Sequence, residues 1–141
     1  MISKLAVAVL ATALSSSGCA TLGLGGRSRQ NLSTSPTMPA SEGNVRFAAA
    51  SNDNTSIELT VKHLAHPEKL TPPASTYVVW TRTTKDAPPQ NIGALSVDKN
   101  LIGTLTTVSP LHRFELFVTA EGSGQVQQPS GPPLLWTDYG R

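Results

Sequence analysis

The stretch Thr76-Tyr-Val-Val-Trp-Thr-Arg82 decides how the rest of this chain is interpreted. Two β-branched valines stand between two large aromatics, and the stretch contains no Gly, Pro, Asn or Asp. Such a composition fits a pleated strand that is apolar enough to be covered on both faces. The stretch is therefore predicted to be a buried strand, with the segments after Asn44 arranged as further strands beside it.

Six further segments after Asn44 have the pattern of short strands, and polar, Gly- or Pro-containing turns separate them. The clearest is residues 57–63, in which Ile57, Leu59 and Val61 alternate with polar residues. The others are 45–49, 91–95, 101–108, 113–120 and 134–137. Seven short strands predict an all-β fold, an immunoglobulin-like β-sandwich over residues 44–141.

Charge and cysteine content limit the classes of function. The formal net charge is +2, and no run of Lys or Arg exceeds the pair Arg27 and Arg29. This distribution argues against a nucleic-acid partner and against a polybasic membrane contact. Cys19 is the single cysteine, so no intramolecular disulfide and no cysteine-based zinc site can form.

Residues 1–18 have the features of an export signal. Lys4 supplies a positive charge, residues 5–14 are apolar, and small residues follow up to Cys19. A membrane-spanning helix needs about twenty apolar residues, roughly twice the length of this run. The segment is therefore predicted to be a signal peptide that is removed, and not an anchor.

Ser17, Gly18 and Cys19 resemble the lipobox of bacterial lipoproteins, although Ser16 stands where leucine is commonest. The resemblance implies that Cys19 becomes the first mature residue and carries a diacylglycerol with fatty acids such as palmitate. Ala20 after the cysteine resembles the pattern for sorting to the outer membrane in cells with two membranes. Two alternatives remain: an ordinary signal peptide cut just after Ala20, or an N-terminal segment that is retained.

Residues 19–43 are rich in Gly, Ser, Thr and Pro and show neither hydrophobic period, which is typical of a flexible tether. The cluster Gly23-Leu-Gly-Gly26 is not a phosphate-binding loop, because no strand precedes it and no Gly-Lys-Ser/Thr is present. The sequence thus predicts a signal peptide at 1–18, a tether at 19–43 and one domain at 44–141.

From Tyr77 onward, the order of several short motifs resembles the extracytoplasmic C-terminal domain of anti-sigma-K factors. These motifs are Tyr77 with Trp80, Ile92-Gly93, Val118-Thr119, Gly122-Ser123 and Pro129-Ser130-Gly131-Pro132. The resemblance covers about sixty residues and implies a β-sandwich located in the cell envelope, in which these residues are structural landmarks. The family's helical sigma-binding domain, zinc motif and membrane helix have no counterpart here, so sigma-factor inhibition is not implied.

The three histidines are the candidate metal ligands. His63 and His66 lie three residues apart, so they would point to opposite faces of a strand, and Pro67 opposes a helix that would bring them together. A hydrogen-bonded His63 at the rim of a sheet is the preferred interpretation. His112 follows Pro110 and is expected on a loop. No metal site is predicted, although a fold that collected all three histidines would allow one.

The aromatic residues are the candidate contact residues. Tyr77 and Trp80 have the right chemistry to stack on a sugar or a peptide, but a Trp on a central strand is more often part of the core. Trp136 and Tyr139 form either an exposed contact pair near the C-terminus or the last strand that caps the sandwich.

No catalytic motif is recognisable: the chain has no Gly-x-Ser-x-Gly elbow, no paired carboxylates and no phosphate loop. We therefore expect a lipid-anchored envelope protein without enzymatic activity or cofactor, carrying a small interaction or sensory module. Its expected partners are the membrane, through the lipid, and an unidentified envelope protein or cell-wall component. Two alternatives remain, a regulator or sensor in an envelope-stress sigma/anti-sigma circuit and a periplasmic metal-binding module.

Overall fold

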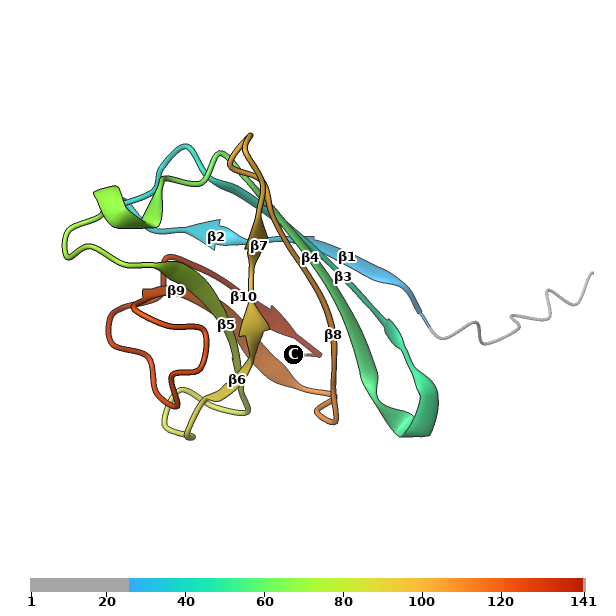
Figure 1. The fold of residues 1–141 in the computed structure, drawn as a ribbon. Helices are drawn as coiled ribbons and strands as arrows, with labels where there is room; N and C mark the ends of the chain where they lie inside the picture. The colour runs from blue at the N-terminus through green and yellow to red at the C-terminus, as the bar shows by residue number, and fades with distance from the viewer. Residues whose placement is uncertain (1–25, 141) are drawn as a thin grey trace, which may run out of the picture.

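Two antiparallel five-stranded sheets pack face to face in the structure, a computed structural model that describes residues 26–140 (Figure 1). Sheet A contains, in spatial order, β1 (Ser28–Asn31), β3 (Glu42–Ala49), β4 (Thr55–Lys62), β8 (Gly103–Ser109) and β7 (Ser96–Val97). Sheet B contains β2 (Ser33–Thr34), β10 (Leu135–Tyr139), β9 (Phe114–Glu121), β5 (Thr76–Arg82) and β6 (Gln90–Ala94). Two single 3₁₀ turns, η1 (Ser51–Asp53) and η2 (Pro67–Lys69), lie in the connections.

The strand order is that of an immunoglobulin-like sandwich. Without β1 and β2, the sheets run β3-β4-β8-β7 and β10-β9-β5-β6. These orders correspond to A-B-E-D and G-F-C-C′ of immunoglobulin domains. The predicted fold class is therefore confirmed, with ten strands in the described residues instead of seven. The prediction missed β1, β2 and β7, which are two to four residues long.

The predicted tether is wrong for residues 28–43. β1 pairs with residues 44–47 of β3, and β2 pairs with Leu135 and Trp136 of β10. Leu32, between β1 and β2, is only 7% exposed and belongs to the core, as does Met38. An edge strand needs backbone hydrogen bonds to only one neighbour, so a segment rich in Ser, Thr and Gln can form one. The domain begins at Ser28, and residues 19–25 of the predicted tether lie outside the described residues.

The chain crosses from one sheet to the other at both long sides of the sandwich. Buried Leu32 connects β1 of sheet A to β2 of sheet B. Buried Leu95 connects β6 of sheet B to β7 of sheet A, and the two strands run as one continuous segment in Figure 1. Just before this crossing, Gly93 has φ +135, and a Cβ there would lie 3.0 Å from Leu105 Cδ1. These two constraints explain why a glycine occupies this landmark position.

β5 is covered on both faces, as predicted. Its residues from Tyr77 to Thr81 are all 0% exposed. Tyr77 and Val79 belong to the core between the sheets, whereas Val78 and Trp80 belong to a second apolar cluster on the outer face of sheet B. Trp80 is therefore buried, but its interpretation as a residue of the sandwich core is wrong, because position 80 faces away from sheet A.

Tyr77 offers a test of the core. Its hydroxyl donates a hydrogen bond to the Ala65 carbonyl at 2.7 Å. Burial, and secondarily the charge of Glu68, raise the pKa of Tyr77 from 10.0 to about 12. A raised pKa means that the folded state holds this proton more tightly than the unfolded state. The corresponding stabilisation is fully present below pH 10 and is lost as the pH rises from 10 to 12.

We therefore expect the free energy of unfolding of the wild type to fall by about 2 kcal/mol across this interval because of Tyr77 alone. The measurement is urea unfolding at a series of pH values between 9 and 12, for the wild type and for Tyr77→Phe. The variant should show a flatter profile over this range, since its ring carries no titrating group. Parallel profiles for the two proteins would contradict the assignment.

Candidate functional site

The outer face of sheet B is covered by the connection between β9 and β10, residues 122–134, which Figure 1 shows folding back beside β5 and β9. Trp80, Phe117 and Trp136 are direct cross-strand neighbours on this face. Trp80 is 0% and Phe117 2% exposed, and their rings stack with centroids 6.4 Å apart. Val126 of the connection packs against them, while Trp136 stays half-buried. The connection thus hides two aromatic rings and leaves the third at its margin.

A chain of hydrogen bonds fastens this connection to the sheet. Trp80 Nε1 donates to Thr119 Oγ1 at 2.8 Å, and the Thr119 hydroxyl donates to Glu121 Oε1 at 2.6 Å. Ser130 donates twice to Glu121, from its amide to Oε1 at 2.9 Å and from its hydroxyl to Oε2 at 2.5 Å. Glu121 is only 1% exposed. A buried carboxylate is tolerated when such bonds replace its hydration.

Asn91 of β6 forms a second attachment. Its Nδ2 donates to the carbonyls of Gly124 at 3.0 Å and Val126 at 2.9 Å, and its Oδ1 accepts from the Gly93 amide at 2.9 Å. The connection is therefore attached near both of its ends. This makes it a fixed part of the surface beside Trp136.

A groove of about 400 Å³ opens on the same face, next to Trp136. Its lining consists of Ser35, Arg82, Lys85, Glu115, Pro133 and Trp136. Arg82 Nε lies 2.6 Å from Glu115 Oε2, and the two side chains are only 19% and 8% exposed. The guanidinium carbon of Arg82 also lies 4.6 Å from the centroid of the Phe117 ring. Because an ion pair with Glu115 and a cation–π contact with Phe117 hold the Arg82 side chain in place, its orientation is fixed before any ligand binds.

The chemistry of the groove suits binding. Trp136 offers an aromatic face, and Lys85 and the Arg82–Glu115 pair offer charge of both signs at one rim. A peptide segment or a sugar combines an apolar face with polar groups in this way. Among the residues that line the groove, no hydroxyl pairs with a base, since the Ser35 hydroxyl lies 2.6 Å from that of Thr37.

A larger hollow of about 650 Å³ lies along β6 and the loop residues Gly124, Gln125 and Gln127. The residues of β6 that line it include Gly93 and Ala94, and the Asn91 side chain is already engaged by the loop. This hollow contains no aromatic or charged side chain in its lining. We therefore regard the groove beside Trp136 as the candidate site.

Sequence reasoning did not single out Arg82, Lys85 or Glu115. Arg82 and Glu115 are far apart in the sequence, yet they are direct partners in the β5–β9 register. The available signal was weak: Arg82 is the last residue of a mostly apolar strand, and Glu115 is the second residue of β9. Only the register of the sheet brings them together.

The histidines do not converge on a common point. β4 ends at Lys62, and His63 follows it with φ 56 as an exposed residue, so the prediction that His63 continues the strand is wrong. His66 Nδ1 lies 3.8 Å from Glu68, and His112 Nε2 lies 3.4 Å from Asp53 beyond the opposite end of β4. Eight strand residues span about 23 Å. Within residues 26–140, no group of three His, Cys, Asp or Glu residues is placed to hold a metal ion.

Trp136 and Tyr139 do not form a pair. They lie three positions apart on β10 and face opposite sides of sheet B. Tyr139 caps the sandwich core, where its ring stacks on Phe47 with centroids 4.2 Å apart and contacts Phe114 at 5.4 Å. Of these two residues, only Trp136 is therefore available for a contact surface. Trp80 and Tyr77 are fully buried, so neither has a ring face free to stack on a ligand.

The remaining predicted residues fall into two groups. Ser17, Gly18 and Cys19 lie outside the described residues. The landmarks that carry the anti-sigma-K resemblance divide between the two faces of sheet B. Trp80 and Thr119 belong to the hydrogen-bond chain on the outer face, and Pro129 to Pro132 surround Ser130 at its end. Tyr77 and Val118 belong to the core between the sheets, and Gly93 approaches Leu105 of sheet A. Trp80, Thr119 and residues 129–132 therefore hold the connection over sheet B, whereas the other landmarks serve the core.

Comparisons with known protein families, with curated proteins and with solved structures found no significant match to this chain. Between residues 26 and 140, no helix has the length and apolar character to cross a membrane.

Proposed function

We propose that the chain is a lipid-anchored envelope protein whose β-sandwich is a binding module without enzymatic activity. The observation that carries the binding role is the groove beside Trp136, where an aromatic face adjoins the fixed Arg82–Glu115 pair. Preorganised polar groups next to an aromatic surface favour recognition, because little side-chain freedom is lost on binding. The attachment role is supported by the sequence around Cys19.

The anchor is tested by mass spectrometry of the N-terminal peptide. In the wild type, we expect the mature chain to begin at Cys19 and to carry covalently bound fatty acids. Cys19→Ala should lose this modification and leave the membrane fraction, because a single apolar segment of this length does not span a bilayer. Thr21→Ala keeps the cysteine and serves as the matched control. A wild-type chain that starts after Ala20, or a free Cys19 thiol, would contradict the anchor.

The groove is tested by photocrosslinking in intact cells, with a benzophenone amino acid placed at position 136 or at exposed position 106 on sheet A. We expect a discrete adduct from position 136 only. Lys85→Glu should lower its yield several-fold, because this change reverses the charge at the rim of the groove. Lys99→Glu makes the same change in a distant turn and should leave the yield unchanged. Equal adducts from both positions, or an adduct indifferent to Lys85, would exclude the groove.

A second candidate function is regulation within an envelope-stress sigma/anti-sigma circuit. It is favoured by the convergence of Trp80, Thr119 and the segment Pro129–Pro132 on one structural unit next to the groove. The identity of the crosslinked partner separates the two functions. A regulator of sigma-factor activity among the adducts would support this second function, and cell-wall material alone would count against it.

A further inference from the structure

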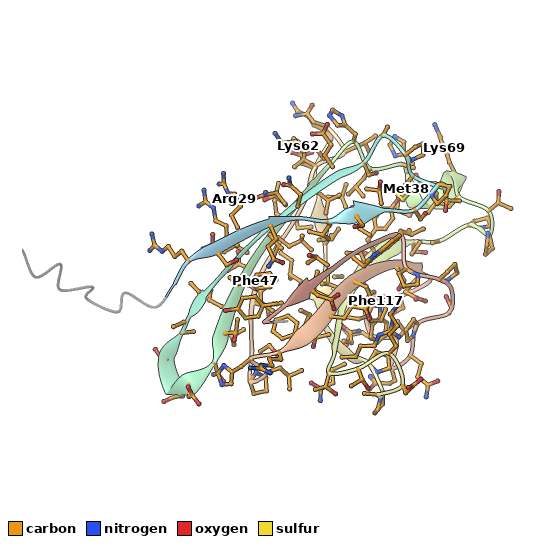
Figure 2. All side chains as sticks on the ribbon, turned by 180° about the vertical axis from the view of Figure 1, so that it is seen from behind. Arg29, Met38, Phe47, Lys62, Lys69 and Phe117 are labelled. Atoms are coloured by element: carbon orange, nitrogen blue, oxygen red, sulfur yellow. The ribbon has the colours of Figure 1, made fainter. Side chains whose placement is uncertain are left out.

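Sheet A carries a basic surface close to the predicted anchor. Arg27 and Arg29 are exposed at the start of the domain, and Arg46 on β3 is exposed beside them. Arg29 and Arg46 are direct partners in the β1–β3 register, so their side chains share the outer face of sheet A. Figure 2 shows Arg29 projecting away from the sheets, on the side of the molecule opposite Lys69. We call Arg27, Arg29 and Arg46 the basic face.

The linear sequence, which has no basic run, argues against a polybasic membrane contact, but the β1–β3 register gathers Arg29 and Arg46 on one face. The charges of the basic face are incompletely balanced within the domain. Like charges that face each other across two strands repel. Glu58 is the other cross-strand neighbour of Arg46 and offsets one of the three charges. None of the three arginines forms an ion pair with another described residue. Farther along the sheet, Glu42 faces Lys62, so the net positive charge is confined to the end where β1 begins.

An exposed apolar side chain lies on the same outer surface of sheet A, on β8, separated from Arg46 on β3 by β4. Val108 is 53% exposed and is the exposed large hydrophobic residue of the described chain. It pairs with Ser56, and in the next outward-facing row Glu58 pairs with Thr106. Cations and an exposed apolar side chain on one surface are a combination that suits the boundary between lipid headgroups and acyl chains.

The position of the first strand decides how close this face is to the bilayer. Because β1 begins at Ser28, only residues 20–27 separate Cys19 from the folded domain. Whatever their conformation, these residues span at most about 30 Å. In an anchored protein, the start of β1 therefore lies no more than about 30 Å from the membrane surface. From there, rotation can bring the basic face within the screening length of about 8–10 Å.

We propose that the basic face docks on the anionic headgroups of the membrane to which the chain is anchored, which turns the groove of sheet B toward the aqueous side. This inference rests on the proposed lipid anchor. Each arginine near an anionic surface strengthens the contact about fivefold, so replacing all three weakens it about 100-fold. The anchor makes the contact intramolecular, and a weak attraction is then sufficient to orient the domain.

The test uses a chemical anchor, so that its outcome does not depend on lipidation in the cell. Both sheets and the core lie between Ser28 and Tyr139, and the chain from Cys19 to Arg141 therefore keeps the whole fold. Its single thiol, Cys19, is coupled to a maleimide lipid in nanodiscs of phosphatidylcholine with or without phosphatidylglycerol. A gadolinium-chelating lipid then broadens the amide NMR signals of whichever face lies next to the bilayer.

We expect amides of β1 and β3 to be broadened much more than those of β6, only in the anionic discs and only at low salt. Arg27→Gln/Arg29→Gln/Arg46→Gln should abolish the difference, whereas the charge-matched control Lys69→Gln/Lys99→Gln/Arg113→Gln should keep it. Equal broadening of both sheets in anionic discs would overturn the inference. So would shifts of the β1 and β3 signals with protein concentration in the absence of lipid, which would indicate contact with a second copy.

Discussion

Trp80→Ala is expected to lower the free energy of unfolding by about 3–5 kcal/mol, the usual cost of truncating a fully buried Trp. Trp80 is 0% exposed between Val78, Phe117 and Val126, and its indole nitrogen donates to Thr119. The substitution leaves a cavity under the β9–β10 connection and removes the donor at the start of the hydrogen-bond chain. Since a domain of this size has only about 5–15 kcal/mol of total stability, a large part of it would be lost.

The measurement is urea unfolding followed by circular dichroism. Trp136→Ala is the matched control, because Trp136 stands in the same cross-strand row but is half-buried, and about 1–2 kcal/mol is expected for it. Trp80→Phe retains most of the apolar contact and should lose about 1 kcal/mol through the missing hydrogen bond. If Trp80→Ala were no worse than Trp136→Ala, Trp80 would not be enclosed by the connection.

Glu121→Ala is expected to lower the free energy of unfolding by about 2–4 kcal/mol and to release the β9–β10 connection from the sheet. The Glu121 carboxylate accepts three hydrogen bonds, one from the Thr119 hydroxyl and two from Ser130. Without the carboxylate, these donors lose their partner in a site that excludes water. Glu121→Gln keeps the size of the side chain but accepts at only one oxygen, so an intermediate loss is expected.

Hydrogen exchange separates this local release from a general loss of stability. The Ser130 amide should exchange about 10–100 times faster in Glu121→Ala, while core amides change only as far as global stability does. Glu68→Ala removes an exposed carboxylate and should alter stability by less than about 0.5 kcal/mol. A double-mutant cycle between Glu121→Ala and Ser130→Ala should show strong coupling, since the two residues share two hydrogen bonds. Additive effects would mean that Glu121 and Ser130 act independently.

The fold class was predictable because the alternation of apolar and polar residues within single segments indicates strands. Val45 with Phe47, and Ile57 with Leu59 and Val61, alternate with polar residues, and the structure places these apolar side chains in the core. Thr76–Arg82 contains no polar alternation, and its five central residues are buried. Each of these patterns depends on neighbouring residues within one strand, so it can be recognised in the sequence without knowledge of the tertiary structure.

The domain boundary was not predictable in the same way. Residues 28–34 have the composition of a linker, and their strands exist because β3 and β10 offer backbone partners. The candidate groove likewise joins residues from β5, β9 and β10 that no local pattern connects. The same holds for Arg29 and Arg46, which are neighbours only through the β1–β3 register.

By itself, the sequence determined the seven longer strands, the buried faces of β3 and β4 and the single thiol at Cys19, because alternation and composition act over a few neighbouring residues. Only the tertiary structure decided which side of β5 Trp80 occupies and what covers it there. A strand that is apolar on both faces does not reveal which face meets the other sheet. That choice follows from the pairing of β5 with β9 and from the connection that Glu121 and Ser130 hold over its outer face.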